Sequence, residues 1–156
     1  MMKLGIIANF PSPEQLAYVK GLGLSFVEMC NNYDHESQRF NDTFHIMKQS
    51  VADAGLFIGS IGRWNAELNK GGKVNEDEYR LIESNLDKAI SVGCPTFVTG
   101  VNYDGSVSLF RNYAAAIEIF GRLIDHAKGT GTRIASYNCD WNNFVNNMTA
   151  WSVVLG

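Results

Sequence analysis

The sequence predicts an α/β protein whose parallel strands form an incomplete (β/α) barrel of TIM type. Short apolar segments alternate with longer segments whose apolar residues recur at helical spacing. A glycine precedes four successive apolar segments, at Gly23, Gly55, Gly93 and Gly131, at intervals of about 30 to 40 residues. Glycine readily takes the left-handed conformation that ends a helix before a strand. Repeated β-α units of this kind indicate parallel strands joined by right-handed crossovers.

The same patterns predict each element in turn. We expect strands near residues 3–9, 24–29, 56–61, 96–101 and 133–138. We expect helices near residues 12–21, 75–92, 113–128 and 146–155. A further helix is expected to begin near Asn41 or Asp42 and to end at Gly55, because its apolar spacing starts at Phe44. The glycine-rich segment 69–74 is expected to be flexible.

Two architectures are compatible with these units. A doubly wound sheet of five strands would be complete in about 150 residues, whereas a (β/α)₈ barrel needs roughly 250. The segment after the first strand carries no glycine-rich phosphate loop, and the sequence ends directly after a helical pattern. Both features favour the barrel. We therefore interpret residues 1–156 as the N-terminal portion of a single barrel domain, with about four βα units and a fifth strand.

Composition excludes some classes of protein. The net charge is −3 and the pI is near 5.5, so no basic field is available for a nucleic-acid backbone. The three cysteines are widely spaced and form no CxxC pair, which is typical of a reducing compartment. The first apolar run is too short for a signal peptide or a membrane span. We expect a cytoplasmic protein without nucleic-acid or membrane partners.

Polar and aromatic residues follow the predicted strands, where the ligands of parallel-sheet proteins bind. Glu28 is a carboxylate inside an apolar strand, so it either binds a sugar hydroxyl or forms a structural bridge to Arg63 or Arg133. The stretch Thr132–Phe144 combines a short apolar run with a polar and aromatic exit that includes Asp140, Trp141 and Asn142. The candidate substrate-binding residues are Glu28, Arg63, Trp64, Asn65, Asn102, Tyr137 and Asn138. Arginine, tryptophan and asparagine together suit a sugar or a sugar phosphate, although a surface loop has the same composition.

The segments KLGIIAN (3–9), Phe26-Val27-Glu28 and ASYNCDWNNF (135–144) resemble the sugar phosphate isomerase/epimerase family, within the xylose-isomerase-like barrel superfamily. This resemblance implies proton transfer between adjacent carbons of a sugar or hydroxy-ketone, assisted by Mg²⁺, Mn²⁺ or Zn²⁺. In that family the metal ligands come from the fifth to eighth strands, and a glutamate commonly follows the fifth. Here Tyr137-Asn138 stands at that place, and neither side chain is a good substitute for a carboxylate. We expect no metal site within this chain, and the catalytic residues stay unassigned.

Three functions therefore stay open. The first is a sugar phosphate isomerase or epimerase, which would be active when the barrel is complete. The second is a non-catalytic carbohydrate- or metabolite-binding relative that lacks the metal glutamate. The third, a metal-dependent endonuclease relative, is disfavoured by the acidic charge. The first and fifth strands would leave open sheet edges, so we expect a homo-oligomer.

Overall fold

The computed structural model describes residues 3–139 and 143–156, so Asp140, Trp141 and Asn142 lie outside the described residues. Five strands form one sheet in the order β1-β2-β3-β6-β7, and every neighbouring pair is parallel. The strands are β1 (Gly5–Ile7), β2 (Phe26–Cys30), β3 (Phe57–Arg63), β6 (Thr96–Thr99) and β7 (Arg133–Ser136). This confirms the predicted set of five parallel strands, although most of them are shorter than expected.

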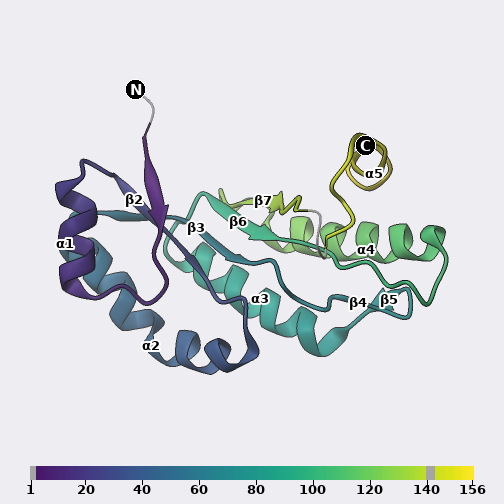
Figure 1. Cartoon of the computed structure of the whole chain (residues 1–156), viewed down its shortest axis with the longest axis horizontal. Coiled ribbons are helices and arrows are strands. Elements are labelled where there is room, and N and C mark those ends of the chain that lie inside the picture. The colour runs from purple at the N-terminus through teal and green to yellow at the C-terminus, as the bar shows by residue number, and fades with distance from the viewer. Residues whose placement is uncertain (1–2, 140–142) are drawn as a thin grey trace.

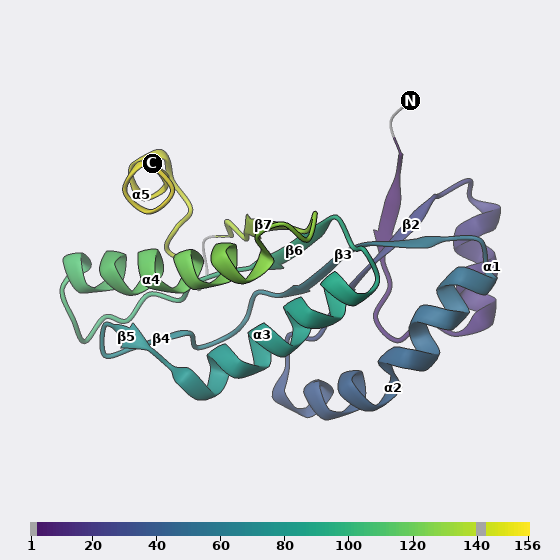
Figure 2. The same ribbon diagram turned by 180° about the vertical axis from the view of Figure 1, so that it is seen from behind.

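Helices follow the strands in regular alternation. They are α1 (Pro13–Gly21), α2 (Asp34–Asp53), α3 (Glu76–Ser91), α4 (Leu109–Ala127) and α5 (Met148–Val154). In Figures 1 and 2, α2 and α3 lie below the sheet, whereas α5 lies above it. Helices α2 and α3 thus cover one side of a curved sheet, and we call the opposite side the inner face.

The four glycines that were predicted to end helices have the expected backbone conformation. Their φ angles are 76° at Gly23, 66° at Gly55, 62° at Gly93 and 86° at Gly131. All four values lie in the left-handed region, where a Cβ atom would add strain. Gly23, Gly55 and Gly93 directly follow the C-cap residues of α1, α2 and α3, whereas after α4 that place is taken by Gly129, with a φ angle of 80°.

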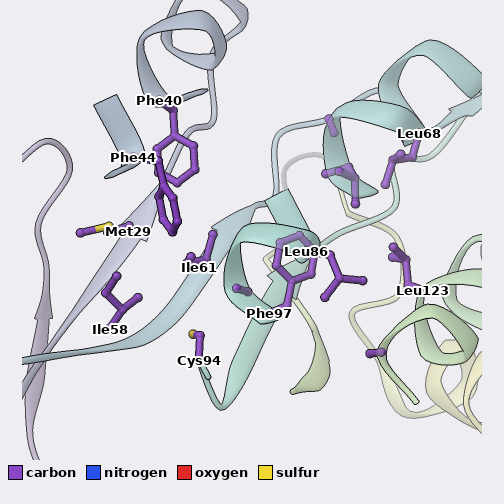
Figure 3. Close-up of a cluster of buried hydrophobic side chains, with 14 of the residues drawn as sticks. Met29, Phe40, Phe44, Ile58, Ile61, Leu68, Leu86, Cys94, Phe97 and Leu123 are labelled. Atoms are coloured by element: carbon purple, nitrogen blue, oxygen red, sulfur yellow. The ribbon is translucent and has the colours of Figure 1, made fainter. Parts of the chain in front are cut away.

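The hydrophobic core lies between the sheet and the helices. Val27, Met29, Ile61 and Phe97 point from the strands toward the helices and are buried. Figure 3 shows Phe40 and Phe44 of α2 beside Met29 of β2, and Leu86 of α3 beside Phe97 of β6. Because successive strand residues point to opposite faces, the residues between these core positions face the inner side.

Helix α2 begins earlier than the sequence predicted, at Asp34 instead of near Asn41. Its first turn is polar, so the apolar spacing gave no signal before Phe40. The turn is stabilised locally, because the backbone N–H of Tyr33 donates to the Glu36 carboxylate at 3.3 Å. That contact is a capping interaction, and it satisfies a backbone donor at the helix start.

The segment 69–74 is an antiparallel hairpin and not a flexible loop. Strands β4 (Asn69–Lys70) and β5 (Lys73–Val74) are joined by Gly71 and Gly72, whose φ angles are 64° and 72°. Two positive φ angles in a two-residue loop are typical of the turns that match strand twist. The hairpin lies between β3 and α3 in the chain and contacts α4.

Within the described residues, β1 and β7 are the edges of the main sheet. Leu4, Ile6 and Ile7 are exposed along β1. In the part of the chain that the structure covers, no helix combines the length and apolar character needed to cross a membrane.

Candidate functional site

Glu28 faces the inner side of the sheet near the carboxyl end of β2. Its neighbours Val27 and Met29 are buried against the helices, so alternation along the strand turns the carboxylate the other way. The side chain is half-buried. A carboxylate in this position can accept hydrogen bonds from a ligand that enters from the inner face.

Trp64 and Tyr137 form an aromatic pair on the same side. Their ring centroids are 4.9 Å apart and the planes are inclined by only 23°. The Trp64 ring lies over Gly62, where a Cβ atom would come within 2.7 Å of it. The backbone N–H groups of both residues are fixed, since Trp64 donates to Asn32 Oδ1 at 2.9 Å and Tyr137 to the Thr99 carbonyl at 2.8 Å. Both rings are half-buried, so together they form an aromatic platform that stays accessible.

The phenol of Tyr137 keeps its proton at neutral pH. Burial raises its pKa above the ordinary value, and the neighbouring Cys139, including its hydrogen bond, and the negative charge of Glu28 raise it further. These groups therefore share one electrostatic environment. A protonated phenol is a hydrogen-bond donor and a poor metal ligand.

Cys30 lies at the end of β2, next to the first strand's exit. Asn9 Oδ1 accepts the backbone N–H of Cys30 at 2.8 Å and lies 3.1 Å from its thiol. Burial raises the pKa of the Cys30 thiol, and Glu28 and Glu36 raise it further. The thiol is therefore neutral at physiological pH and does not act as a thiolate nucleophile.

Asn143 belongs to the same region, although it was not among the candidate residues that the sequence indicated. It is buried over Gly100, at a place that a Cβ atom on that glycine would occupy. Its Nδ2 lies 3.6 Å from Cys139 Sγ, and its Oδ1 has no hydrogen-bond partner among the described residues. The actual cap of α5 is Asn147, whose Oδ1 accepts the Ala150 N–H at 3.0 Å. In the sequence, Gly100 lies near the end of a predicted strand and shortly before polar residues. This glycine was the signal that a side chain such as Asn143 could pack there.

Arg63 lies on the helix side and not on the inner face. Its side chain is only 1% exposed, and it pairs with Glu78 of α3 at 3.2 Å. This placement differs from the expected ligand contact, and also from a bridge to Glu28. The reason is alternation: Arg63 points the same way as Ile61, while Gly62 points inward.

The side chain of Asn102 likewise makes structural hydrogen bonds within the fold. Its Oδ1 accepts the Asn69 N–H and its Nδ2 donates to the Asn69 carbonyl, both at 2.8 Å. The side-chain amide of Asn102 thus pairs with the backbone of Asn69 as a neighbouring strand would, and it holds the β4-β5 hairpin. Of the other candidates, Asn65 and Asn138 are exposed at the rim beside Trp64 and Tyr137.

The described residues do not supply the donor set of a divalent cation. Among residues 3–139 and 143–156, no three His, Cys, Asp or Glu side chains lie close enough to share a metal ion. Glu28 has the neutral phenol of Tyr137 and the neutral thiol of Cys30 as its inner-face neighbours. Such a set does not outcompete the hydration shell of Mg²⁺.

Comparison with solved structures places this arrangement in a known fold. The chain is similar to 3-keto-D-glucoside 4-epimerase from E. coli, with a TM-score of 0.79 and 16% identity over 99% of this chain and 64% of that one. It is similar to a xylose isomerase-like TIM barrel protein from Mycobacterium smegmatis in complex with magnesium, with a TM-score of 0.71 and 18% identity over 92% and 51%. It is also similar to an AP endonuclease of family 2 from Brucella melitensis, with a TM-score of 0.65 and 16% identity over 96% and 58%.

The chain therefore has the fold of a TIM-type (β/α) barrel over the part that it spans. More particularly, this is the fold of the xylose isomerase-like barrels, and the solved proteins that share it include sugar epimerases. The chain spans between 51% and 64% of the length of the three proteins described above. No family model matches the sequence, and no curated protein matches it. At these identities the likeness is one of fold.

Proposed function

We propose that the inner face of this sheet binds a sugar, and that the complete barrel is a sugar isomerase or epimerase. The observation that carries the proposal is the aromatic platform of Trp64 and Tyr137, with the Glu28 carboxylate on the same face. Sugar sites combine an apolar stacking surface with a few well-placed polar groups. The similarity of fold to sugar epimerases supports a sugar isomerase or epimerase by analogy.

The inner face favours an unphosphorylated sugar over a sugar phosphate. Of the candidate ligand residues that we predicted, Arg63 alone carries a positive charge, and its guanidinium is buried against Glu78. The remaining charged candidate, Glu28, would repel a phosphate. Asn65 and Asn138, both exposed at the rim, are suited to a neutral polyol.

Isomerisation or epimerisation requires removal of a proton from a carbon next to a carbonyl, by a base within hydrogen-bond reach. Glu28 is our candidate for a carboxylate that orients or deprotonates the sugar. Tyr137, whose raised pKa keeps its proton, can donate a hydrogen bond to the substrate oxygen. The described residues do not bring together the donor set of a metal ion.

Solvent exchange at carbon tests the catalytic part of the proposal. The protein with its complete barrel is incubated in D₂O with ketoses and their phosphate esters, with and without Mg²⁺, and deuterium at the carbons beside the carbonyl is followed by NMR. We expect exchange on an unphosphorylated ketose, lost in Glu28→Gln and retained in the control Glu83→Gln, which lies on the surface of α3.

Two other outcomes discriminate between functions. Binding of the sugar without any exchange would favour the non-catalytic carbohydrate-binding relative. Neither binding nor exchange with any sugar of the panel would contradict the proposal as a whole.

A further inference from the structure

Arg63 and Trp64 are adjacent residues at the end of β3 that serve opposite sides of the sheet. Trp64 carries the aromatic platform on the inner face, and Arg63 enters the layer between the sheet and the helices. Any movement of this short piece of backbone moves both side chains. The contacts of the buried arginine therefore constrain the position of the platform.

Arg63 is held by groups from three different segments. Its Nη1 donates to the Asn31 carbonyl at 2.8 Å and to Ser37 Oγ at 3.3 Å. Its Nη2 donates to both carboxylate oxygens of Glu78, at 3.3 and 3.2 Å. These acceptors belong to the loop after β2, the first turns of α2 and the first turn of α3. A guanidinium is suited to this task because its donors form a rigid planar fork.

The same loop after β2 also holds Trp64. Asn32 Oδ1 accepts the Trp64 N–H at 2.9 Å, and the neighbouring Asn31 exchanges side-chain hydrogen bonds with Asn85 of α3 at 3.0 and 3.4 Å. On the other side of β3, Thr99 Oγ1 donates to the Arg63 carbonyl at 2.9 Å. The backbone that carries the platform is thus fixed by hydrogen bonds from both sides.

We propose that Arg63 is a positioning residue for the ligand site, acting through Trp64 and not by touching the ligand. The Arg63–Glu78 pair holds the end of β3 so that the Trp64 ring lies over Gly62 and against Tyr137. Ligand affinity at the inner face then depends on a buried ion pair on the opposite side of the sheet. The affinity part of this proposal rests on the proposed sugar-binding function, whereas the structural part does not.

Fluorine NMR of the chain labelled with 5-fluorotryptophan reports on Trp64 directly, with its signal assigned by Trp64→Phe. We expect the Trp64 signal to shift in Glu78→Gln and in Arg63→Lys, because the ring leaves its place against Tyr137. Glu76→Gln is the matched control: it breaks another Arg–Glu pair, with Arg122 at 2.7 and 3.0 Å, in the same turn of α3. The control should leave the Trp64 signal in place. Ser37→Ala removes one acceptor of Arg63 with little change in volume, and should give a smaller shift in the same direction.

Sugar affinity gives the second readout. We expect Glu78→Gln to weaken binding by about tenfold or more, as small misplacements of a binding group do. In a Trp64→Ala background the same change should cost no further affinity, because Arg63 acts through Trp64. A Trp64 signal that stays at its original position in Glu78→Gln, Arg63→Lys and Ser37→Ala would overturn the proposal. If the Trp64 signal shifts in these variants but the chain binds no sugar, the proposed sugar-binding function is wrong, while the positioning role of Arg63 is supported.

Discussion

Three side chains on the inner face occupy space that is open because the neighbouring residues, in or directly after strands, are glycines. The Phe26 ring occupies the space beside Gly5 and Gly59, Trp64 lies over Gly62, and Asn143 lies over Gly100. In each case a Cβ atom on the glycine would collide with the side chain above it. Glycine in a strand often marks a close approach of this kind. The inner face thus has room for these side chains because its glycines have no Cβ atom.

Gly62→Ala tests this packing where it matters for the site. The added methyl group would lie 2.7 Å from the Trp64 ring, so the ring must move away from Tyr137. We expect a loss of about 1 to 3 kcal/mol in the free energy of unfolding, together with a shifted Trp64 fluorine signal. The control is Gly21→Ala at the end of α1, where the methyl group meets nothing within 4 Å. Equal behaviour of the two variants would contradict the packing described here.

The buried thiols give the chain a pH dependence whose sign follows from their pKa values. Burial raises the pKa of Cys30 and of Cys94 above the ordinary value of 9.0. The folded state therefore holds these protons more tightly than the unfolded state, and the stabilisation is complete below the unfolded-state pKa. It is lost as the pH rises through the folded-state values, so the free energy of unfolding should fall above about pH 9.

Urea titrations between pH 8 and 11 measure that fall, and thiol labelling identifies its source. Half-buried Cys139 should react first with a disulfide reagent at pH 8, and Cys30 and Cys94 should react slowly. A free energy of unfolding that stays constant over this range, with three equally reactive thiols, would show that the two buried thiols are exposed in solution.

At the scale of single elements, the β4-β5 hairpin is held in part by the buried side-chain amide of Asn102. Asn102 makes two hydrogen bonds to the backbone of Asn69, and Asn69 Nδ2 reaches Asn112 Oδ1 at 2.6 Å. Asn102→Ala leaves the N–H and carbonyl of Asn69 without these partners. We expect a loss of about 2 to 3 kcal/mol in the free energy of unfolding, measured by chemical denaturation.

Exposed Asn65→Ala serves as the control for that measurement, because the described structure gives its side chain no hydrogen bond to lose. Its effect should stay within about 0.5 kcal/mol. Hydrogen exchange adds the local readout: protection of the Asn69 amide should vanish in Asn102→Ala. Protection that persists would mean that the hairpin is held by other contacts.

The elements that sequence could predict are those whose signal is local. Glycines near helix ends and apolar strand runs each act on their own backbone, and the structure follows them. The start of α2 gave no such signal, because its first turn has no apolar periodicity. The direction of Arg63 depends on strand register, and the role of Asn102 depends on a hairpin 33 residues away. Such long-range contacts leave no pattern in one sequence.

At the scale of the whole molecule, the sheet of the described residues ends in two unpaired edges, β1 and β7. Unpaired edges beside exposed apolar side chains, here Leu4, Ile6 and Ile7, favour pairing with another chain. We predict that this 156-residue chain is at least dimeric in solution. Sedimentation velocity over a range of concentrations measures this, and Ile6→Lys at the β1 edge should weaken the association. A monodisperse, folded monomer at all concentrations would contradict the prediction.

The inner face of the curved sheet carries Glu28, Trp64 and Tyr137, and our central claim is that this face binds an unphosphorylated sugar. Isothermal titration with a ketohexose tests it most directly, with the phosphate ester of the same sugar as a second ligand. We predict one site per chain, weakened about tenfold or more by Trp64→Ala and by Glu28→Gln, and a weaker response to the phosphate ester. Absence of binding, or binding that neither substitution changes, would contradict the account.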